Sequence, residues 1–131
     1  MPEVRSKTAK SVRIELPEIP PDLNKIVGMA TCNRYLYGQE KKRWKEMMRL
    51  LSCRLPRFTE KVDIYLTCVF GTKAHHDRDN YWACFKFILD GLACIEDDNS
   101  DLVEPHLNPF QYEKGQRRAY IDIIKREPQV D

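Results

Sequence analysis

The sequence predicts a small mixed α/β domain in which two helices pack on a mixed sheet. Segments in which apolar and polar residues alternate, as they do in half-buried strands, lie near both ends and in the middle of the chain. Two segments with apolar residues at helical spacing separate them. Because 131 residues suit one hydrophobic core, we expect a single domain with the order strand, helix, strand, helix, then one or two strands.

The first predicted strand covers residues 12–16, where Val12, Ile14 and Leu16 alternate with charged side chains. The polar residues 1–10 before it are expected to be frayed. Three prolines follow between positions 17 and 21, and proline lacks the N–H that a helix or an inner strand needs. We therefore expect a long irregular loop over 17–37, and in small domains loops of this length usually carry function.

The first predicted helix begins near Gly38 and stops before Pro56. Its apolar residues recur at helical spacing, at Trp44, Met47, Met48, Leu51 and Leu55. A second strand follows over 62–70, where apolar residues again occupy alternate positions.

The second predicted helix, over Tyr81–Leu92, is apolar on nearly all sides, which indicates that it is largely buried. Residues 102–111 contain Pro105 and Pro109 and suit a short edge strand, because proline is tolerated at the edge of a sheet. The segment 119–125 is rich in β-branched residues and is predicted to be the last strand.

The composition excludes several classes of protein. Hydrophobic residues make up 42% and charged residues 32% of the chain, which excludes collagen-like and low-complexity sequences. No apolar run is long enough to cross a bilayer and no secretory signal is visible, so we expect a cytoplasmic protein without a membrane partner. The five cysteines contain no C-x-x-C pair, which argues against a zinc or redox motif.

The net charge of +2 hides two strongly charged blocks. Residues 34–57 hold eight basic and two acidic side chains, whereas residues 77–104 hold eight acidic and two basic ones. A basic surface beside an acidic cluster suits a protein that binds a polyanion and holds a divalent metal against it. Two solvated faces of opposite charge would give the same pattern.

The acidic block contains carboxylates that converge. Asp77 and Asp79 follow the second strand at positions i and i+2, which point to the same side. At about 100° per residue, Lys86 and Asp90 fall on the same face of the following helix as Asp79. A further acidic cluster follows at 96–98. Oxygen ligands of this kind suit magnesium or manganese rather than zinc.

Each of these features also has a purely structural explanation. Aspartate is a common helix cap, so Asp79 suits that position, and Lys86 and Asp90 stand one helical turn apart, as salt-bridge partners do. His75 and His76 precede the acids, but neighbouring residues of a strand point to opposite sides, so only one of them can join the acids. We favour a phosphate contact or a plain loop role for these histidines over catalysis.

The motif resembles that of the RusA family of Holliday-junction resolvases, which are small, dimeric, magnesium-dependent endonucleases. The resemblance runs in order from about Val12 to Lys125, and it is carried by Asp77-x-Asp79-Asn80, Lys86-x-x-x-Asp90-Gly-Leu92 and Glu96-Asp97-Asp98. The early segment Leu16-x-x-x-Pro20-Pro21-x-x-Asn24 is also similar to the one that follows the first strand of that family.

The resemblance implies a site and a reaction. The metal-binding carboxylates would be Asp77, Asp79 and Asp98, with Asp97 as the alternative third ligand. The catalytic lysine would be Lys86, which stands three residues further along than the family lysine. Secondary candidates are Asp90, Asn80 and His76. The implied cofactor is Mg²⁺, with Mn²⁺ as a substitute, and the implied reaction is hydrolysis of a DNA phosphodiester.

The implied partner is branched DNA, in particular the four-way junction. The bases expected to contact phosphates, with little sequence preference, are Lys25, Arg34, Lys41, Lys42, Lys45 and Arg49. A junction has approximate two-fold symmetry and needs two opposed nicks, so a homodimer is expected, with part of the apolar second helix in its interface. The alternatives are a nuclease for flaps or forks and a non-catalytic DNA-binding module.

Overall fold

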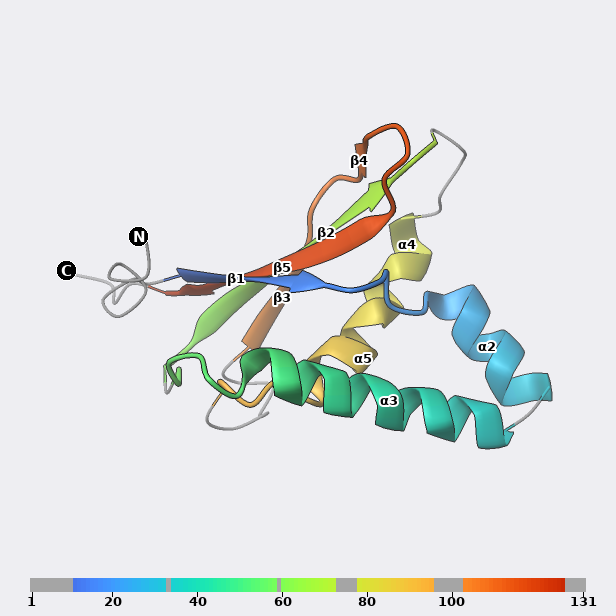
Figure 1. The fold of residues 1–131 in the computed structure, drawn as a ribbon, viewed down its shortest axis with the longest axis horizontal. Helices are drawn as coiled ribbons and strands as arrows, with labels where there is room; N and C mark the ends of the chain where they lie inside the picture. Colours follow the sequence, from blue (N-terminus) through green and yellow to red (C-terminus); the bar gives the residue numbers. More distant parts are fainter. Residues whose placement is uncertain (1–10, 33, 59, 73–77, 96–102, 127–131) are drawn as a thin grey trace.

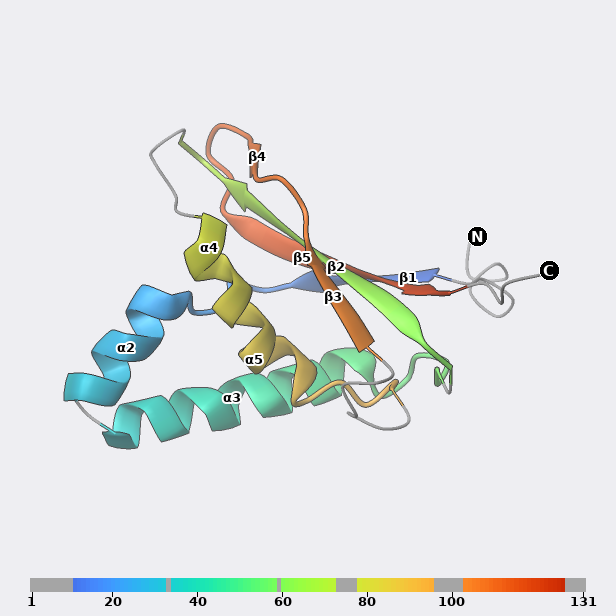
Figure 2. The same ribbon diagram turned by 180° about the vertical axis from the view of Figure 1, so that it is seen from behind.

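The structure is a computed structural model that describes residues 11–32, 34–58, 60–72, 78–95 and 103–126. In these ranges the chain forms one mixed α+β unit, with a five-stranded sheet whose helices lie on one side (Figures 1 and 2). The predicted fold class is therefore confirmed. Residues 1–10, which we expected to be frayed, lie outside the described residues.

The sheet has the strand order β1-β5-β2-β3. Its strands are β1 Ser11–Leu16, β2 Val62–Phe70, β3 Val103–Leu107, β4 Gln111–Tyr112 and β5 Arg118–Lys125. Strand β5 lies between β1 and β2 and is antiparallel to both, whereas β3 and the short β4 run parallel to β2. All four predicted strand segments are thus present, and the sheet is mixed, as expected.

The alternation of side chains sets the two faces of the sheet. Ile64 and Leu66 of β2 point toward the helices and are completely buried, and their β5 neighbours Ile121 and Ile123 are buried with them. The intervening residues face away from the helices. Period-two patterning therefore predicts correctly which face of each strand enters the core.

The predicted irregular loop over 17–37 is wrong beyond its proline-rich beginning. Helix α2 spans Leu23–Cys32, and helix α3 already begins at Arg34. Asp22 starts α2, because its carboxylate accepts the backbone N–H of Lys25 at 2.9 Å, which is how an N-cap satisfies a free donor of the first turn. Helix α2 then buries Ile26 against the core. The described chain consequently has three helical segments instead of the expected two, and α2 packs on α3 and α4 beside the sheet (Figure 1).

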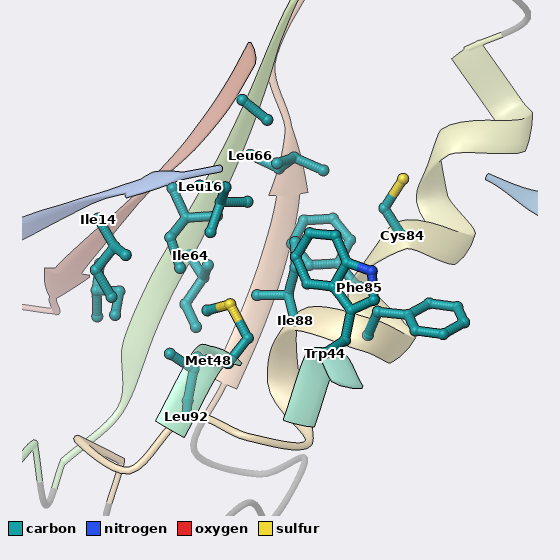
Figure 3. Packing of buried hydrophobic residues seen from close by; sticks show 14 of the residues in the cluster. Ile14, Leu16, Trp44, Met48, Ile64, Leu66, Cys84, Phe85, Ile88 and Leu92 are labelled. Carbon is teal, nitrogen blue, oxygen red and sulfur yellow. The ribbon is translucent and has the colours of Figure 1, made fainter. Parts of the chain in front are cut away.

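Helix α3 spans Arg34–Ser52, so it begins four residues before the predicted start at Gly38 and ends before Pro56, as predicted. Trp44 and Met48 are completely buried on its inner side. Figure 3 shows both side chains in the core with Ile64 and Ile88. The 3.6-residue spacing of apolar residues thus identifies the buried side of this helix.

The second predicted helix is divided into three short pieces. These are α4 Arg78–Tyr81, the 3₁₀ turn η1 Trp82–Cys84 and α5 Phe85–Leu89. Tyr81, Cys84 and Ile88 are buried, which confirms that the segment is largely enclosed. Because a 3₁₀ turn advances about 120° per residue, η1 rotates the two ends relative to a regular helix by roughly 60°.

No helix in the described part of the chain is long and apolar enough to cross a membrane.

Candidate functional site

The predicted site residues divide into described and undescribed groups. Asp79, Asn80, Lys86 and Asp90 are described. The other predicted acids and the histidine, namely Asp77, Asp97, Asp98 and His76, lie outside the described residues. Within the described ranges, no group of three His, Cys, Asp or Glu side chains is placed to hold a metal ion. The predicted three-carboxylate arrangement is therefore neither supported nor contradicted.

Asp79 lies in α4, just beyond the carboxyl end of the parallel strands β2 and β3. Its neighbour Arg78 donates a hydrogen bond to the carbonyl oxygen of Leu107, the last residue of β3. On the buried side of α4, the ring of Tyr81 packs edge-on against Phe70 at 5.6 Å between centroids. Asp79 itself is exposed. The strand ends thus fix the start of α4 and present the Asp79 carboxylate to solvent.

The aromatic cluster under α4 is kept apolar by burial. Tyr81 also contacts Phe110 edge-on, at 5.1 Å between ring centroids. Burial raises the pKa of the Tyr81 hydroxyl to about 12, so it stays neutral at physiological pH. Tyr81 is consequently an anchor for α4 and does not supply charge to the site.

Lys86 and Asp90 line one cavity of about 500 Å³ on the outer side of α5. The rest of its wall is apolar and comes from η1, α5, the following segment and β3: Trp82, Ala83, Phe85, Leu89, Leu92, Ile95, Val103 and Pro105. Lys86 and Asp90 are both exposed, and they form no salt bridge with each other. The structural explanation of these two residues as a simple helix-surface ion pair is therefore wrong.

Asp79 is not among the residues of this cavity. The intervening 3₁₀ turn leaves Asp79 about 40° from Lys86 and about 80° from Asp90 around the helical axis, where a regular helix would give about 20° to each. The predicted shared face of Asp79, Lys86 and Asp90 is consequently wider than a regular helix would give, at about 80° from Asp79 to Asp90. Lys86 and Asp90 line the same cavity, and Asp79 does not.

Five predicted DNA contacts form one surface, which we call the basic flank of α3: Arg34, Lys41, Lys42, Lys45 and Arg49. At about 100° per residue, these positions fall within roughly 100° of the helix circumference. All five are exposed, and none makes an ion pair in the described part of the chain. Lys41 also lies over the ring of Tyr37, at 5.7 Å from its centroid.

The sixth predicted contact, Lys25, does not belong to this flank. It lies in α2 near Glu40, whose pKa is lowered mainly by the hydrogen bond from Arg43 and to a smaller extent by the charge of Lys25. Arg43 also binds Glu18 at 2.8 Å. This side of α3 therefore has its charges paired within the protein, whereas the basic flank has free ones.

The basic flank adjoins the segment that carries Lys86 and Asp90. A Cβ atom on Gly91 would lie 2.3 Å from the carbonyl oxygen of Lys45, so only glycine allows this approach. Two residues later, the backbone N–H of Ala93 donates to the buried Ser52 hydroxyl at 2.8 Å. Sequence reasoning assigned no role to Ser52 or Gly91, although glycine is the residue that a close approach of two backbones favours.

The sheet face opposite the helices carries a separate polar cluster. Asp63 accepts hydrogen bonds from His106 at 2.9 Å and from the Arg126 guanidinium at 3.2 Å. The ring of His106 stacks on Tyr65, with centroids 4.5 Å apart. The Arg126 contact, followed by His106, lowers the pKa of Asp63 below its usual value. Since these charges satisfy each other, this face offers little to a polyanion.

No protein-family model matches the chain, and no curated protein matches its sequence.

Proposed function

We propose that this protein is a magnesium-dependent endonuclease that nicks branched DNA, and that its preferred substrate is the four-way junction. The observation that carries the proposal is the close contact between α3 and the Gly91 segment, which packs the helix that bears the unpaired basic flank against the segment that bears Lys86 and Asp90. A phosphodiester hydrolase needs this combination, because phosphates must be held close to carboxylates that bind a metal.

The basic flank would hold the DNA backbone. Its five side chains are exposed and make no ion pair in the described part of the chain, so binding DNA breaks none there. Lysine and arginine contacts to phosphate fix the orientation of a duplex and carry little sequence information. Selection of a substrate by its branched shape rather than its sequence is consistent with this type of surface.

The metal would be held by Asp79 with Asp77 and Asp98, or with Asp97 in place of Asp98. Asp79 fits this role because its carboxylate is exposed at the carboxyl end of the two parallel strands, and oxygen donors suit Mg²⁺ and Mn²⁺. When bound, such an ion neutralises charge on the phosphate and lowers the pKa of a bound water.

The resemblance gives Lys86 the role of the catalytic lysine. Its ammonium is exposed and forms no ion pair within the described chain, so it is available to stabilise negative charge on a phosphate. A four-way junction needs two opposed nicks, so we propose that the active form is a homodimer with two-fold symmetry.

The test is incubation of the protein with a synthetic four-way junction and Mg²⁺ or Mn²⁺. We expect paired nicks from the unmodified protein and a loss of at least about 100-fold with Asp79→Asn, since a metal ligand is removed. Glu104→Gln is the matched control, because Glu104 is an exposed carboxylate on β3 that faces away from the helices. It should nick at the normal rate.

Each outcome decides between the alternatives. Junction binding without nicking under either metal would favour a non-catalytic DNA-binding module and overturn the nuclease. Faster nicking of flaps or forks than of junctions would keep the nuclease and change its substrate. Equal nicking by Asp79→Asn and the unmodified protein would overturn the assignment of the metal site.

A further inference from the structure

The connection between β4 and β5 carries an exposed arginine at the same end of the sheet as α4 (Figure 1). Residues 113–117 turn at Gly115, whose φ of +77° favours glycine, and the Gln116 N–H donates to the Glu113 carbonyl oxygen at 3.0 Å. The turn is also held by β2, because the Glu113 N–H donates to the carbonyl oxygen of Phe70 at 3.0 Å. A well-supported backbone therefore presents the side chains of this turn where α4 begins.

The arginine of this turn, Arg117, projects toward the helices. It stands two residues before the buried Ala119 and so shares the helix-covered side of the sheet. Its guanidinium lies over the ring of Phe70, 5.6 Å from the centroid. The pKa of Tyr81, which burial raises, is lowered in part by the charge of Arg117, so this charge also acts on the last residue of α4. Arg117 is consequently near the turn of helix that holds Asp79.

The charge of Arg117 is not neutralised within the described part of the chain. Arg117 makes the ring contact with Phe70 but no ion pair there. Its neighbour Arg118 projects from the opposite face of the sheet, where it pairs with Glu15 at 3.6 Å and with Glu113 at 3.4 Å. A guanidinium that is supported by a ring and has no carboxylate partner keeps its donors available for phosphate oxygens, which arginine binds in a bidentate manner.

We propose that Arg117 is a substrate-binding residue, which holds the backbone phosphate of the nicked strand next to the phosphate that is cleaved at Asp79. The assignment rests on the proposed function, because it concerns the DNA of the same site. Figure 2 shows that α4 begins at the end of the sheet that carries the β4–β5 turn and that α5 lies beside α3. The segment from α4 to α5 then runs between two phosphate-binding elements, Arg117 and the basic flank. Holding the strand at both fixes the reacting atoms in place, which lowers the barrier to reaction.

The first test measures binding of a synthetic four-way junction without divalent metal, by fluorescence anisotropy over a range of salt concentrations. Arg117→Ala should weaken binding by about ten-fold, because one charged hydrogen-bonded contact is lost. The slope of the logarithm of the binding constant against the logarithm of the salt concentration should fall by about 0.9. Arg117→Lys should keep the slope, since the charge remains, but should bind less tightly than the unmodified protein, since lysine lacks the bidentate geometry.

Arg118→Ala is the matched control, because it removes the neighbouring arginine from the opposite face, where its charge is already paired. It should leave the affinity and the salt slope unchanged. Arg117 and Arg118 each lie over one aromatic ring, so the two alanine variants should have similar urea midpoints. If Arg117→Ala is less stable than this, Arg117→Lys still decides the matter, because a lysine variant with the low slope of Arg117→Ala would overturn the inference.

The second test measures nicking in Mg²⁺ with the protein in excess over the junction. At saturating protein, Arg117→Ala should nick about ten-fold more slowly, because the phosphate beside the cleaved one is no longer held in place. Arg118→Ala should nick at the normal rate. A normal rate for Arg117→Ala at saturation, with weaker binding, would overturn the placement of this contact beside Asp79.

The outcomes separate this inference from the nuclease. An unchanged salt slope in Arg117→Ala, or an equal loss in Arg118→Ala, would overturn the inference and leave the nuclease in place. A reduced slope in Arg117→Ala, in a protein that nicks no junction with Mg²⁺ or Mn²⁺, would uphold the phosphate contact and refute the catalytic proposal.

Discussion

Gly91 gives the sharpest test of how α5 meets α3. Alanine at this position would place its Cβ 2.3 Å from the Lys45 carbonyl oxygen and 2.9 Å from the Met48 Cβ. Real Cβ atoms essentially never approach another heavy atom within 3.0 Å, so the neighbouring atoms must shift by at least about 0.7 Å. The closest atom belongs to the backbone of α3, and Met48 on the same helix is completely buried. Moving the helix away from residue 91 would therefore disturb the packing of the core.

We therefore expect Gly91→Ala to lower the free energy of unfolding by about 3 kcal/mol, at the upper end of the usual cost of overpacking. This corresponds to a fall in Tm of about 10 °C for a chain of this size. The measurement is urea unfolding followed by circular dichroism, with thermal unfolding as a second readout. Gly91 has no positive φ, so the loss would come from the clash and not from backbone strain.

Gly38→Ala is the matched control. Gly38 lies inside α3, is exposed, and has nothing within 4 Å of the position that a Cβ would take. The same substitution should therefore raise the free energy of unfolding there by about 0.5–1 kcal/mol, because alanine favours the helix. If Gly91→Ala is as stable as the unmodified protein while Gly38→Ala gains, the close packing of the Gly91 segment on α3 is refuted.

Two further predictions concern charge. The double variant Lys45→Ala with Arg49→Ala removes two bases of the basic flank. It should reduce the slope of the logarithm of the DNA-binding constant against the logarithm of the salt concentration by about 2, whereas Lys61→Ala should leave this slope unchanged. An unaltered slope in the double variant would exclude the flank from the DNA interface. Because the pKa of Asp63 is lower in the folded than in the unfolded protein, its stabilising effect is present above the unfolded value of about 4 and is lost as the pH falls through the folded value. Asp63→Asn should therefore be less stable than the unmodified protein at about pH 7, and the difference in urea midpoint should shrink below about pH 4. A difference that persists unchanged at about pH 2 would show that the contact of Asp63 with Arg126 does not depend on the carboxylate charge.

The strands can be predicted because their physical cause is local. Val12, Ile14 and Leu16 alternate with polar residues, and that alternation places every second side chain toward the core whatever the rest of the sheet does. Helix α2 is not predicted from the sequence, because the prolines before it favour a loop and Asp22 is the single signal for a helix start. Its apolar residues Leu23 and Val27 are also exposed, so they do not mark a buried face at helical spacing.

The site can be predicted only in part. The basic flank of α3 follows from helical geometry alone, because Lys41, Lys45 and Arg49 recur every four residues along one unbroken helix. The relation between Asp79 and Lys86 cannot be predicted in this way, because it depends on whether the segment between them is α-helical or 3₁₀. Tyr81, Cys84 and Ile88 of this segment lie in the core, where contacts with distant parts of the chain can override a local helical pattern.

The central position of β5 in the sheet affects how the protein folds during its synthesis. Strand β1 has β5 as its sole neighbour in the described sheet, and about 100 residues separate the two along the chain. During synthesis at about 5–20 residues per second, β1 must wait roughly 5–20 seconds for that neighbour. Strand β2 also lacks β5 until then, so its apolar residues stay accessible to chaperones and to other nascent chains. We expect the yield of native protein to depend on how quickly residues 118–125 follow the rest of the chain out of the ribosome.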